Sequence, residues 1–351
     1  MSFIKILKHK VGKSAKPFII AEAGINHNGS LNKALKMIKV AKVSNANAIK
    51  FQTYKTEELI SNTKKKYRYK SNGKFISESM YDIFKRCEFT ENDWFKIKKK
   101  CDKEKITFLS TPSSFKDLKL LSKLNVPAIK IGSDDFNNIP LIEEAKKTKL
   151  PLILSCGMST LNEIETTLTH SGALKGYPVI LMLCVSKYPT LPKNVNIERL
   201  KYLNFKYPKI KLGFSDHTIG SEAASLALAY GARCFEKHFT LSKKDKGPDH
   251  WFSENKDTLS KWIKSIHDSF EMLGKDNIFP IKEEKAMRVL ARKSIVSSRN
   301  IKKGEVISKN NISFKRPGDG LPPINFKNII GLKSKKFIKK NTQIKFNFLN
   351  K

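Results

Sequence analysis

Short apolar runs rich in β-branched residues recur along most of the chain, and each is followed by polar residues. Runs of this length, bounded by polar turns, are typical of strands buried inside a sheet. Eight of them are predicted to be strands: FIIAEAG (18–24), AIKFQT (48–53), ITFLSTP (106–112), AIKIGSDD (128–135), LILSCGM (152–158), VILMLCVS (179–186), KLGFSDH (211–217) and RCFEKHF (233–239).

Amphipathic segments lie between these runs and repeat their apolar residues with the period of a helix. Strands that alternate with helices predict a parallel sheet, and eight repeats close most simply into a (β/α)8 TIM barrel. In such barrels the catalytic groups lie at the carboxyl ends of the strands. The expected helical segments are 31–45, 92–104, 115–125, 141–149 and 221–230.

The pattern changes near residue 290, where short apolar stretches alternate with turns rich in Gly and Pro. This change predicts a small, mostly β domain after the barrel. We place the barrel at 1–272, a linker at 273–290 and the small domain at 291–351. Residues 60–80 form a polar insertion after the second strand, which we expect to be a mobile loop near the active face.

The composition adds a strong positive charge to this picture. The chain has 351 residues, with 68 Lys and Arg against 32 Asp and Glu, and its formal net charge is +36. Arginine, the residue best suited to reading nucleic-acid bases, is scarce, and the lysines are spread over the whole sequence. We therefore expect a lysine-rich solvated surface and no nucleic-acid partner. A noncatalytic protein that binds polyanions is the alternative from another class.

The sequence gives no sign of a membrane or secreted protein. No apolar run approaches the ~20 residues that a membrane-spanning helix needs, and the N-terminus lacks the features of a secretory signal. The five cysteines show no CxxC spacing, which favours free thiols in a reducing compartment. We therefore expect a cytoplasmic protein with no membrane partner.

Two of the predicted strands end in a histidine, His217 and His238, with one helical segment between them. A strand, a helix and a parallel strand bring both imidazoles to the same end of the sheet. Two imidazoles at that end can bind a divalent metal. The competing interpretation is that each histidine is a solvated loop residue or a satisfied core residue.

Lys50 and Lys130 end the second and fourth strands, so their ammonium groups would share the barrel mouth and bind a phosphate or carboxylate. Neighbouring hydroxyl groups would add hydrogen-bond donors, and carboxylates beside a metal would move protons. For any one of these residues the alternative is a surface or turn group. The hydroxyl residues are Thr111, Ser133, Ser186 and Ser215, and the carboxylates are Glu22, Asp135 and Asp249.

Ten short motifs occur in order along nearly the whole chain: IIAEAGINHNG (19–29), KFQT (50–53), FLSTP (108–112), KIGS (130–133), SCGMST (155–160), SKYPT (186–190), GFSDHT (213–218), EKHFT (236–240), KGPDH (246–250) and KRPG (315–318). Each motif alone is weak, but together they resemble the sialic acid synthase family. That family includes N-acetylneuraminate, legionaminate and pseudaminate synthases. The C-terminal part resembles the family's antifreeze-like (SAF) domain.

The resemblance implies that phosphoenolpyruvate condenses with an N-acetylated hexosamine to give a nine-carbon 2-keto sugar acid and phosphate. N-acetylneuraminate synthase is the first expectation, and legionaminate or pseudaminate synthase is the alternative. A divalent metal is implied on His217 and His238, most simply Mn²⁺, with Mg²⁺ or Co²⁺ as other choices. A domain-swapped homodimer is also implied, in which Arg316 of one subunit reaches the site of its partner.

By the same resemblance, the catalytic candidates are Glu22, Asp135 and Tyr188. The substrate contacts are expected at Lys50, Thr111, Lys130, Ser133, Ser186, Ser215, Asp249 and Arg316. The family often has Glu where this chain has Asp135, and many members have Asn where it has Ser186. A third hypothesis is therefore a barrel that kept the fold and lost activity through Asp135.

Overall fold

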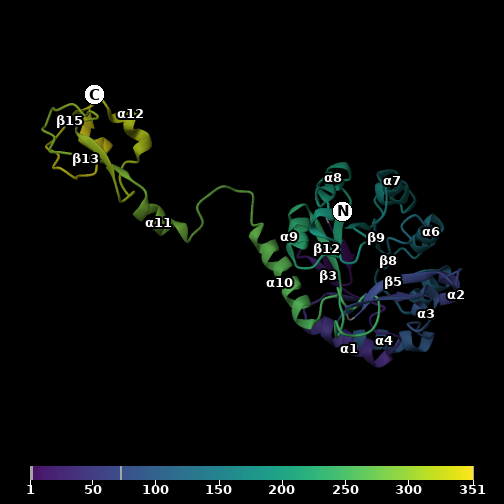
Figure 1. Cartoon of the computed structure of the whole chain (residues 1–351). Helices are drawn as coiled ribbons and strands as arrows, with labels where there is room; N and C mark the ends of the chain where they lie inside the picture. Colours follow the sequence, from purple (N-terminus) through teal and green to yellow (C-terminus); the bar gives the residue numbers. More distant parts are fainter. Residues whose placement is uncertain (1–2, 72, 351) are drawn as a thin grey trace. The chain divides into compact units, whose positions relative to one another are not determined.

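The structure is a computed structural model that describes residues 3–71 and 73–350. The chain divides into two compact units, Met1–Gly274 and Lys275–Lys351. The first unit carries the large parallel sheet, and the second carries only short strands and helices (Figure 1).

The first unit is built on an eight-stranded parallel sheet with the strand order β7-β4-β3-β12-β11-β10-β9-β8. β7 and β8, at the two ends of this order, also lie beside each other, so the sheet closes into a nearly complete barrel. The predicted (β/α)8 fold is confirmed. The barrel strands are β3 (Phe18–Gly24), β4 (Ala48–Thr53), β7 (Thr107–Pro112), β8 (Ile129–Ile131), β9 (Leu152–Ser155), β10 (Val179–Cys184), β11 (Lys211–Asp216) and β12 (Ala232–His238).

Helices surround the outside of this sheet (Figure 1). Several begin with a side chain that caps the first turn; Ser30, for example, accepts a hydrogen bond from the backbone N–H of Lys33. The helices are α1 (Leu31–Val43), α2 (Thr56–Leu59), α3 (Met80–Lys85), α4 (Glu91–Lys103), α5 (Phe115–Lys123), α6 (Ile139–Lys147), α7 (Leu161–His170), α8 (Glu198–Lys206), α9 (Glu222–Ala229) and α10 (Lys256–Met272), with 3₁₀ turns at Ala173–Lys175 and Pro192–Asn194.

Alternate residues of each strand point into the barrel, and their character changes along the strand. On β3, Phe18 and Ile20 belong to the apolar interior, and Glu22 follows them at the mouth. On β12, Cys234 lies in the interior and His238 at the mouth. The alternate residues, such as Ile19 and Ala21 on β3 and Phe235 on β12, pack outward against the helices. The barrel interior is therefore apolar at its amino end and polar at its carboxyl end, where a site can form.

Two hairpins add to the barrel, and the sequence predicted neither. β1 (Ile4–Ile6) pairs antiparallel with β2 (His9–Val11), and their apolar side chains join the interior cluster at the amino end. Strands of three residues carry too little periodic signal to be recognised in the sequence.

The expected loop at 60–80 is instead a hairpin of β5 (Lys66–Ser71) and β6 (Lys74–Ser79). Its residues alternate between the two faces. Tyr69 is buried beside Ile25, while the guanidinium of Arg68 lies on the exposed face over the ring of Phe75, 4.5 Å from its centroid. The high polar content of this segment hid a strand period that the structure shows.

The second unit has its own small apolar core, formed mainly by isoleucines such as Ile295, Ile301 and Ile338. Its strands pair antiparallel, as expected for the predicted mostly β domain. The elements are α11 (Glu284–Ala291), β13 (Ser294–Ser297), β14 (Ile312–Lys315), α12 (Phe326–Ile329), β15 (Lys333–Ser334) and β16 (Leu349–Asn350), with 3₁₀ turns at Pro323–Asn325 and Phe346–Phe348.

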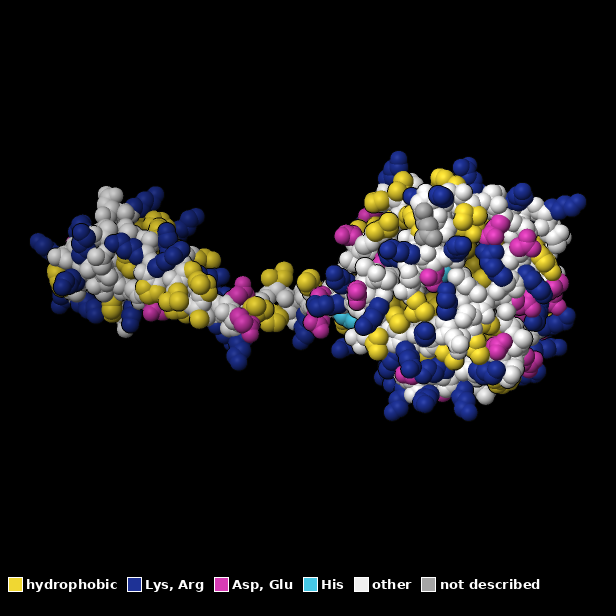
Figure 2. All heavy atoms as spheres, turned by 60° about the horizontal axis from the view of Figure 1, so that its bottom comes forward, with side chains coloured by type: hydrophobic (Ala, Val, Ile, Leu, Met, Phe, Trp, Pro, Cys, Tyr) yellow, Lys and Arg dark blue, Asp and Glu magenta, His cyan; other side chains and the backbone are white. Residues whose placement is uncertain are grey.

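None of the helices within the described ranges combines the length and the apolar composition that crossing a membrane requires. Lys and Arg side chains are scattered over the visible faces of both units, with acidic side chains among them (Figure 2). Several exposed lysines are paired with a neighbouring carboxylate, as Lys123 is with Glu91. The visible surface therefore shows no single basic stripe of the kind that a nucleic-acid-binding protein presents.

Asp216 connects β11 and β12 to α10 through a buried network outside the barrel interior. Its carboxylate accepts hydrogen bonds from Lys237 Nζ at 2.8 Å and from the Trp262 indole at 2.9 Å. Replacing Asp216 by alanine would leave the buried Lys237 ammonium without its nearest counterion and with only Glu254, 3.8 Å away. We expect a loss of about 3–5 kcal/mol in the free energy of unfolding of the barrel unit.

Urea unfolding followed by tryptophan fluorescence measures this loss, because Trp94, Trp251 and Trp262 all lie in the barrel unit. Asp268→Ala, which removes an exposed ion pair with Lys264, is the matched control and should change little. Equal effects of the two substitutions would contradict the structural role of Asp216.

Candidate active site at the carboxyl ends of the barrel strands

The cavity at the barrel mouth has a volume of ≈ 490 Å³. Its polar wall comes from the carboxyl ends of all eight strands and from the loops after them. We call it the mouth cavity. It is lined by Glu22, Lys50, Gln52, Tyr67, Met80, Thr111, Lys130, Gly132, Ser133, Asp134, Ser155, Met158, Cys184, Ser186, Tyr188, Ser215, His217, Glu236 and His238.

Two lysines and two glutamates form a buried cluster at the base of the mouth cavity. Lys50 Nζ lies 2.7 Å from Glu22 Oε2 and 3.6 Å from Glu236 Oε2. Lys130 Nζ lies 3.4 Å from Glu236 Oε1, so Glu236 bridges the two ammonium groups. Thr111 accepts a hydrogen bond from Lys50 Nζ at 3.0 Å. The predicted convergence of Lys50 and Lys130 is therefore present in the structure.

The two glutamates of this cluster differ in their acidity. Burial raises the pKa of Glu22 to about 7, and the neighbouring Lys50 only partly opposes this effect. Burial also acts to raise the pKa of Glu236, but Lys130 and Lys50 outweigh it and hold that pKa at about 2. Glu236 is therefore a fixed anion between two cations, whereas Glu22 can gain or lose a proton near neutral pH.

Several buried polar atoms in the mouth cavity have no hydrogen-bond partner within the described part of the chain. They include Oε1 of Glu22, Oε2 of Glu236, and the hydroxyl groups of Ser155 and Ser186. Buried polar groups in proteins are normally satisfied, so a cluster of free ones indicates where a polar ligand binds. Polar groups on the exposed, lysine-rich surface are hydrated by solvent, so they do not mark a ligand site in this way.

Gly157 allows the hydroxyl groups on this side of the cavity to approach the backbone closely. Its N–H donates to Ser133 Oγ at 3.0 Å. A Cβ atom at this position would lie 2.5 Å from Ser186 Oγ and 2.7 Å from Ser133 Oγ, which is too close. The glycine of the SCGMST motif therefore holds Ser133 and Ser186 side by side at the cavity wall.

His217 and His238 face each other at the rim, with ring centroids 5.4 Å apart. His217 Nδ1 lies 2.8 Å from the carbonyl oxygen of Val185, which fixes the ring and leaves Nε2 directed toward Ser215 Oγ, 3.4 Å away. Nδ1 of His238 is buried without a hydrogen-bond partner, 3.8 Å from a carboxylate oxygen of Asp249. His238 therefore keeps Nδ1 free for a ligand, and His217 Nε2 has only the long contact with Ser215 Oγ, whose hydroxyl also donates to Glu236 at 2.9 Å.

These residues fit a divalent metal in part. Burial and the neighbouring His217 keep the pKa of His238 well below its usual value, so its imidazole is neutral and can act as a ligand. Burial acts to lower the pKa of His217, but Cys184 and the Val185 carbonyl raise it overall. No group of three or more His, Cys, Asp or Glu side chains suited to a metal occurs among the described residues. Oxygen atoms of substrate or water would have to complete the coordination.

A second cavity of ≈ 200 Å³ adjoins the mouth cavity and shares Gln52, Tyr67, Met80, Tyr188 and His238 with it. Asp249 lines only this second cavity, where burial raises the pKa of its carboxyl to about 6. The Tyr188 ring packs 4.2 Å from that of His217, between centroids. Together the two cavities form one elongated space with lysines at one end and Asp249 at the other.

Asp135, a predicted catalytic residue, does not line the mouth cavity. Its carboxylate accepts a hydrogen bond from Asn138 at 2.8 Å, next to the start of α6. Asp134 lines the cavity instead, because the turn after β8 directs the first of the two aspartates inward. The position of Asp135 therefore does not support a catalytic role for it, although the family often has Glu there.

Arg316 lies directly after β14 in the second unit and is exposed. Its expected role in the site of a partner subunit stays a prediction. Apart from Asp135, the other predicted site residues meet at the mouth cavity or, for Asp249, at the cavity beside it.

Glu236 is the main functional candidate that the sequence analysis missed. The sequence could have indicated it. Residues two apart on a strand lie on the same face, so Glu236 shares the face of β12 that carries His238. Cys184, Tyr67, Gln52 and Met80 also line the cavity. Tyr67 and Met80 come from the hairpin and the helix after it, so no motif at a strand end pointed to them.

Comparison with known proteins bears on this site. Residues 37–277 match the NeuB family, and residues 292–350 match the SAF domain. An uncharacterised protein of Methanocaldococcus jannaschii is 42% identical over 92% of this chain and 91% of its own length. The N,N'-diacetyllegionaminic acid synthase of Legionella pneumophila is 35% identical over 91% of each chain.

Among solved structures, the N-acetylneuraminic acid synthetase of Leptospira borgpetersenii, in complex with citrate, is similar to this chain. Its TM-score is 0.73 at 34% sequence identity, covering 81% of this chain and 94% of that one. The family match spans the strands that supply Lys50, Lys130, Ser215, Glu236 and His238. With its closed barrel, its lysine–glutamate cluster and its paired histidines, the chain belongs to the NeuB family.

Proposed function

We propose that this enzyme of the sialic acid synthase type condenses phosphoenolpyruvate with an N-acetylated hexosamine to give a nine-carbon 2-keto sugar acid and phosphate. The observation that carries the proposal is the buried cluster of Lys50, Lys130 and Glu236 directly beside His217 and His238. The cluster suits a small anion with a phosphate and a carboxylate. The histidines suit a site where an aldehyde oxygen is polarised.

Phosphoenolpyruvate would bind at the lysine end of the mouth cavity. Lys50 and Lys130 supply two ammonium groups, and the hydroxyl of Ser186, which has no partner among the described residues, supplies a donor. Ser133, Ser215 and Thr111 lie in the same wall. Glu236 keeps the two ammonium groups apart and oriented, since it contacts both.

The hexosamine would occupy the other end of the elongated space, where Tyr67, Tyr188 and Asp249 line the adjoining cavity. An ionised Asp249 accepts hydrogen bonds from sugar hydroxyl groups, and the two aromatic rings offer flat apolar faces. This placement brings the sugar's aldehyde carbon toward His217 and His238, between the two cavities.

A divalent cation, with Mn²⁺ as our first choice, would be held by His217 and His238 and would supply Lewis-acid polarisation of the aldehyde. In the reaction, C3 of phosphoenolpyruvate forms a bond to the aldehyde carbon, and the aldehyde oxygen takes a proton. Water adds at C2, and the C2–O bond to phosphate breaks. Glu22, with its pKa of about 7, is the carboxyl placed to exchange protons with these oxygens.

The direct test is phosphate release from phosphoenolpyruvate with Mn²⁺, measured separately with N-acetylmannosamine and with the two di-acetamido hexoses used for legionaminate and pseudaminate. Release with N-acetylmannosamine alone would support N-acetylneuraminate synthase, which we place first. The chain is 34% identical to an N-acetylneuraminic acid synthetase and 35% identical to an N,N'-diacetyllegionaminic acid synthase. Because sequence identity does not distinguish the substrates, all three sugars have to be tested. Folded, metal-loaded protein that releases phosphate with none would overturn the proposal.

The sugar end of the site should respond to pH through Asp249. Its pKa of about 6 means that it is a carboxylate above that pH and a neutral acid below it. As pH falls through about 6, we expect the KM for the sugar to rise about tenfold, because charged hydrogen bonds to the sugar are lost, whereas kcat should follow the separate titration of Glu22 near pH 7. Asp249→Asn should show the high KM at every pH. A wild-type KM that is flat from pH 5 to 8 would contradict this role.

We further propose that the enzyme acts in the cytoplasm as a homodimer in which Arg316 of one subunit completes the site of its partner. Mixing Arg316→Ala subunits with Lys50→Met subunits would test this, because only a shared site restores activity in the mixed dimer. The polyanion-binding alternative is not favoured, since the charged groups on the visible faces are of mixed sign (Figure 2). The family match likewise favours an enzyme.

A further inference from the structure

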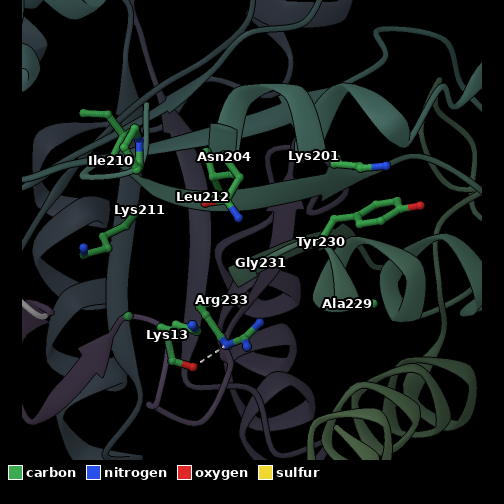
Figure 3. A pocket seen from close by; sticks show the side chains of 12 residues that line it. Lys13, Lys201, Asn204, Ile210, Lys211, Leu212, Ala229, Tyr230, Gly231 and Arg233 are labelled. Atoms are coloured by element: carbon green, nitrogen blue, oxygen red, sulfur yellow. Dashed lines mark hydrogen bonds between the residues drawn. The ribbon is translucent and has the colours of Figure 1, made fainter. Parts of the chain in front are cut away.

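A separate cavity of ≈ 510 Å³ lies at the amino ends of the barrel strands, and we call it the basal cavity. It lies beside the start of β11 and β12, whereas the mouth cavity lies at their carboxyl ends. Strands of six or seven residues separate the two by roughly 20 Å. The basal cavity is lined by Gly12, Lys13, Lys201, Asn204, Pro208, Ile210, Lys211, Leu212, Ala229, Tyr230, Gly231 and Arg233 (Figure 3).

The lining of the basal cavity carries positive charge and no carboxylate. Lys13 and Lys211 have no acidic side chain within salt-bridge distance among the described residues, and Lys211 Nζ reaches only the carbonyl oxygen of Lys209 at 3.3 Å. Lys201 is partly neutralised by Glu198, 3.6 Å away in α8. Glu198 also accepts the hydroxyl of Tyr230 at 2.6 Å, so it lies at one side of the cavity and not within its wall.

Arg233 is the strongest element of this cavity, since only 7% of its surface is exposed. Its Nε donates to the Lys13 carbonyl at 3.0 Å (Figure 3), and its Nη1 donates to the carbonyls of Leu228 and Ala232 at 2.9 and 2.8 Å. These bonds fix the guanidinium, yet its Nη2 has no partner within the described residues. Its other neighbour is the Phe270 ring, 5.5 Å from the guanidinium, so this buried cation has neutral partners and no salt bridge to a carboxylate among the described residues.

We propose that the basal cavity binds a small polyanion that carries phosphate or carboxylate groups. A fixed guanidinium with a free nitrogen provides directional hydrogen bonds to such a group, and the ammonium groups of Lys13 and Lys211 add charge. Asn204 and Tyr230 supply neutral polar and aromatic surface for the rest of the ligand. The volume lies within the range of ~300–1,000 Å³ that small-molecule sites occupy. This proposal does not depend on the reaction at the mouth.

Lysine footprinting of the full chain tests the proposal at named positions. The protein is acetylated briefly with and without inorganic pyrophosphate, and each lysine's modification is followed by mass spectrometry. We expect Lys13 and Lys211 to be modified about tenfold more slowly with pyrophosphate, while Lys8 and Lys209 change little. Lys8 and Lys209 are exposed and nearby in sequence but lie outside the lining. Equal protection of all four, or of none, would overturn the proposal.

Calorimetric titration of two double variants separates this cavity from the mouth. Lys13→Ala/Lys211→Ala should weaken pyrophosphate binding at this site about tenfold or more, whereas Lys8→Ala/Lys209→Ala removes the same charge and should not. The mouth residues are intact in both variants, so binding there contributes equally. A parallel titration with citrate distinguishes a preference for phosphate from one for carboxylate. The same affinity in the two double variants would overturn the proposal.

Discussion

Replacing Lys50 by methionine should lower kcat/KM for phosphoenolpyruvate by about 1,000-fold. Lys50 is buried and lies 2.7 Å from Glu22 and 3.6 Å from Glu236, so an exposed surface lysine cannot take its place. Its loss removes one of the two ammonium groups expected to hold the substrate. It also removes the cation that keeps the pKa of Glu22 from rising further, so Glu22 would be protonated at neutral pH.

The matched control is Lys55→Met, which removes the same charge just beyond the same strand. Lys55 is exposed and pairs with Glu88 at 2.7 Å, outside the mouth cavity. It should leave kcat/KM within about twofold of wild type. Steady-state phosphate release at varied phosphoenolpyruvate measures both, and tryptophan fluorescence verifies that each variant is folded. A Lys50→Met enzyme that is folded and nearly as active as Lys55→Met would remove Lys50 from the proposed substrate site.

Replacing either His217 or His238 by alanine should weaken Mn²⁺ binding at least about 100-fold and turnover about 1,000-fold. The reason is that His238 Nδ1 has no partner, His217 Nε2 has only a 3.4 Å contact with Ser215 Oγ, and no third His, Cys, Asp or Glu joins them into a metal cluster within the described chain. With so few protein ligands, the loss of one leaves too little to hold the ion. Electron paramagnetic resonance of free and bound Mn²⁺ measures the affinity without relying on activity.

His170→Ala is the control for this pair, because His170 is an exposed histidine that pairs with Glu143 at the end of α7. It should leave both Mn²⁺ affinity and turnover unchanged. Wild-type affinity should also fall as the pH is lowered, since the raised pKa of His217 makes a proton compete with the metal. If His217→Ala and His238→Ala bind Mn²⁺ like wild type, the metal is held elsewhere.

The position of Asp135 does not support the third hypothesis, in which the barrel lost its activity through this residue. Asp135 accepts a bond from Asn138 away from the cavity, and Asp134 takes the position at the wall. The shorter aspartate therefore sits at a helix start, where a carboxylate that bonds the capping residue has a local structural use. We therefore expect Asp135→Asn to retain turnover and Asp134→Asn to lose it.

The sequence by itself determined the barrel and most of its mouth. Parallel strands must be buried on both faces, so each appears as a short apolar run, and every barrel strand was predicted within a few residues. Because such strands all point the same way, polar residues at their ends had to meet. Lys50, Lys130, His217 and His238 could be named for that reason alone.

Only the tertiary structure decided which groups touch and how they are charged. Glu236 acquires its role because Lys50 and Lys130 reach it from strands far away in sequence, and its pKa differs from that of Glu22 for the same reason. The choice between Asp134 and Asp135 depends on how one turn leaves β8. The basal cavity joins residues near 13, 211 and 233, and no local pattern brings them together. Periodicity reports the face of a strand, whereas distances between strands arise only when the sheet closes.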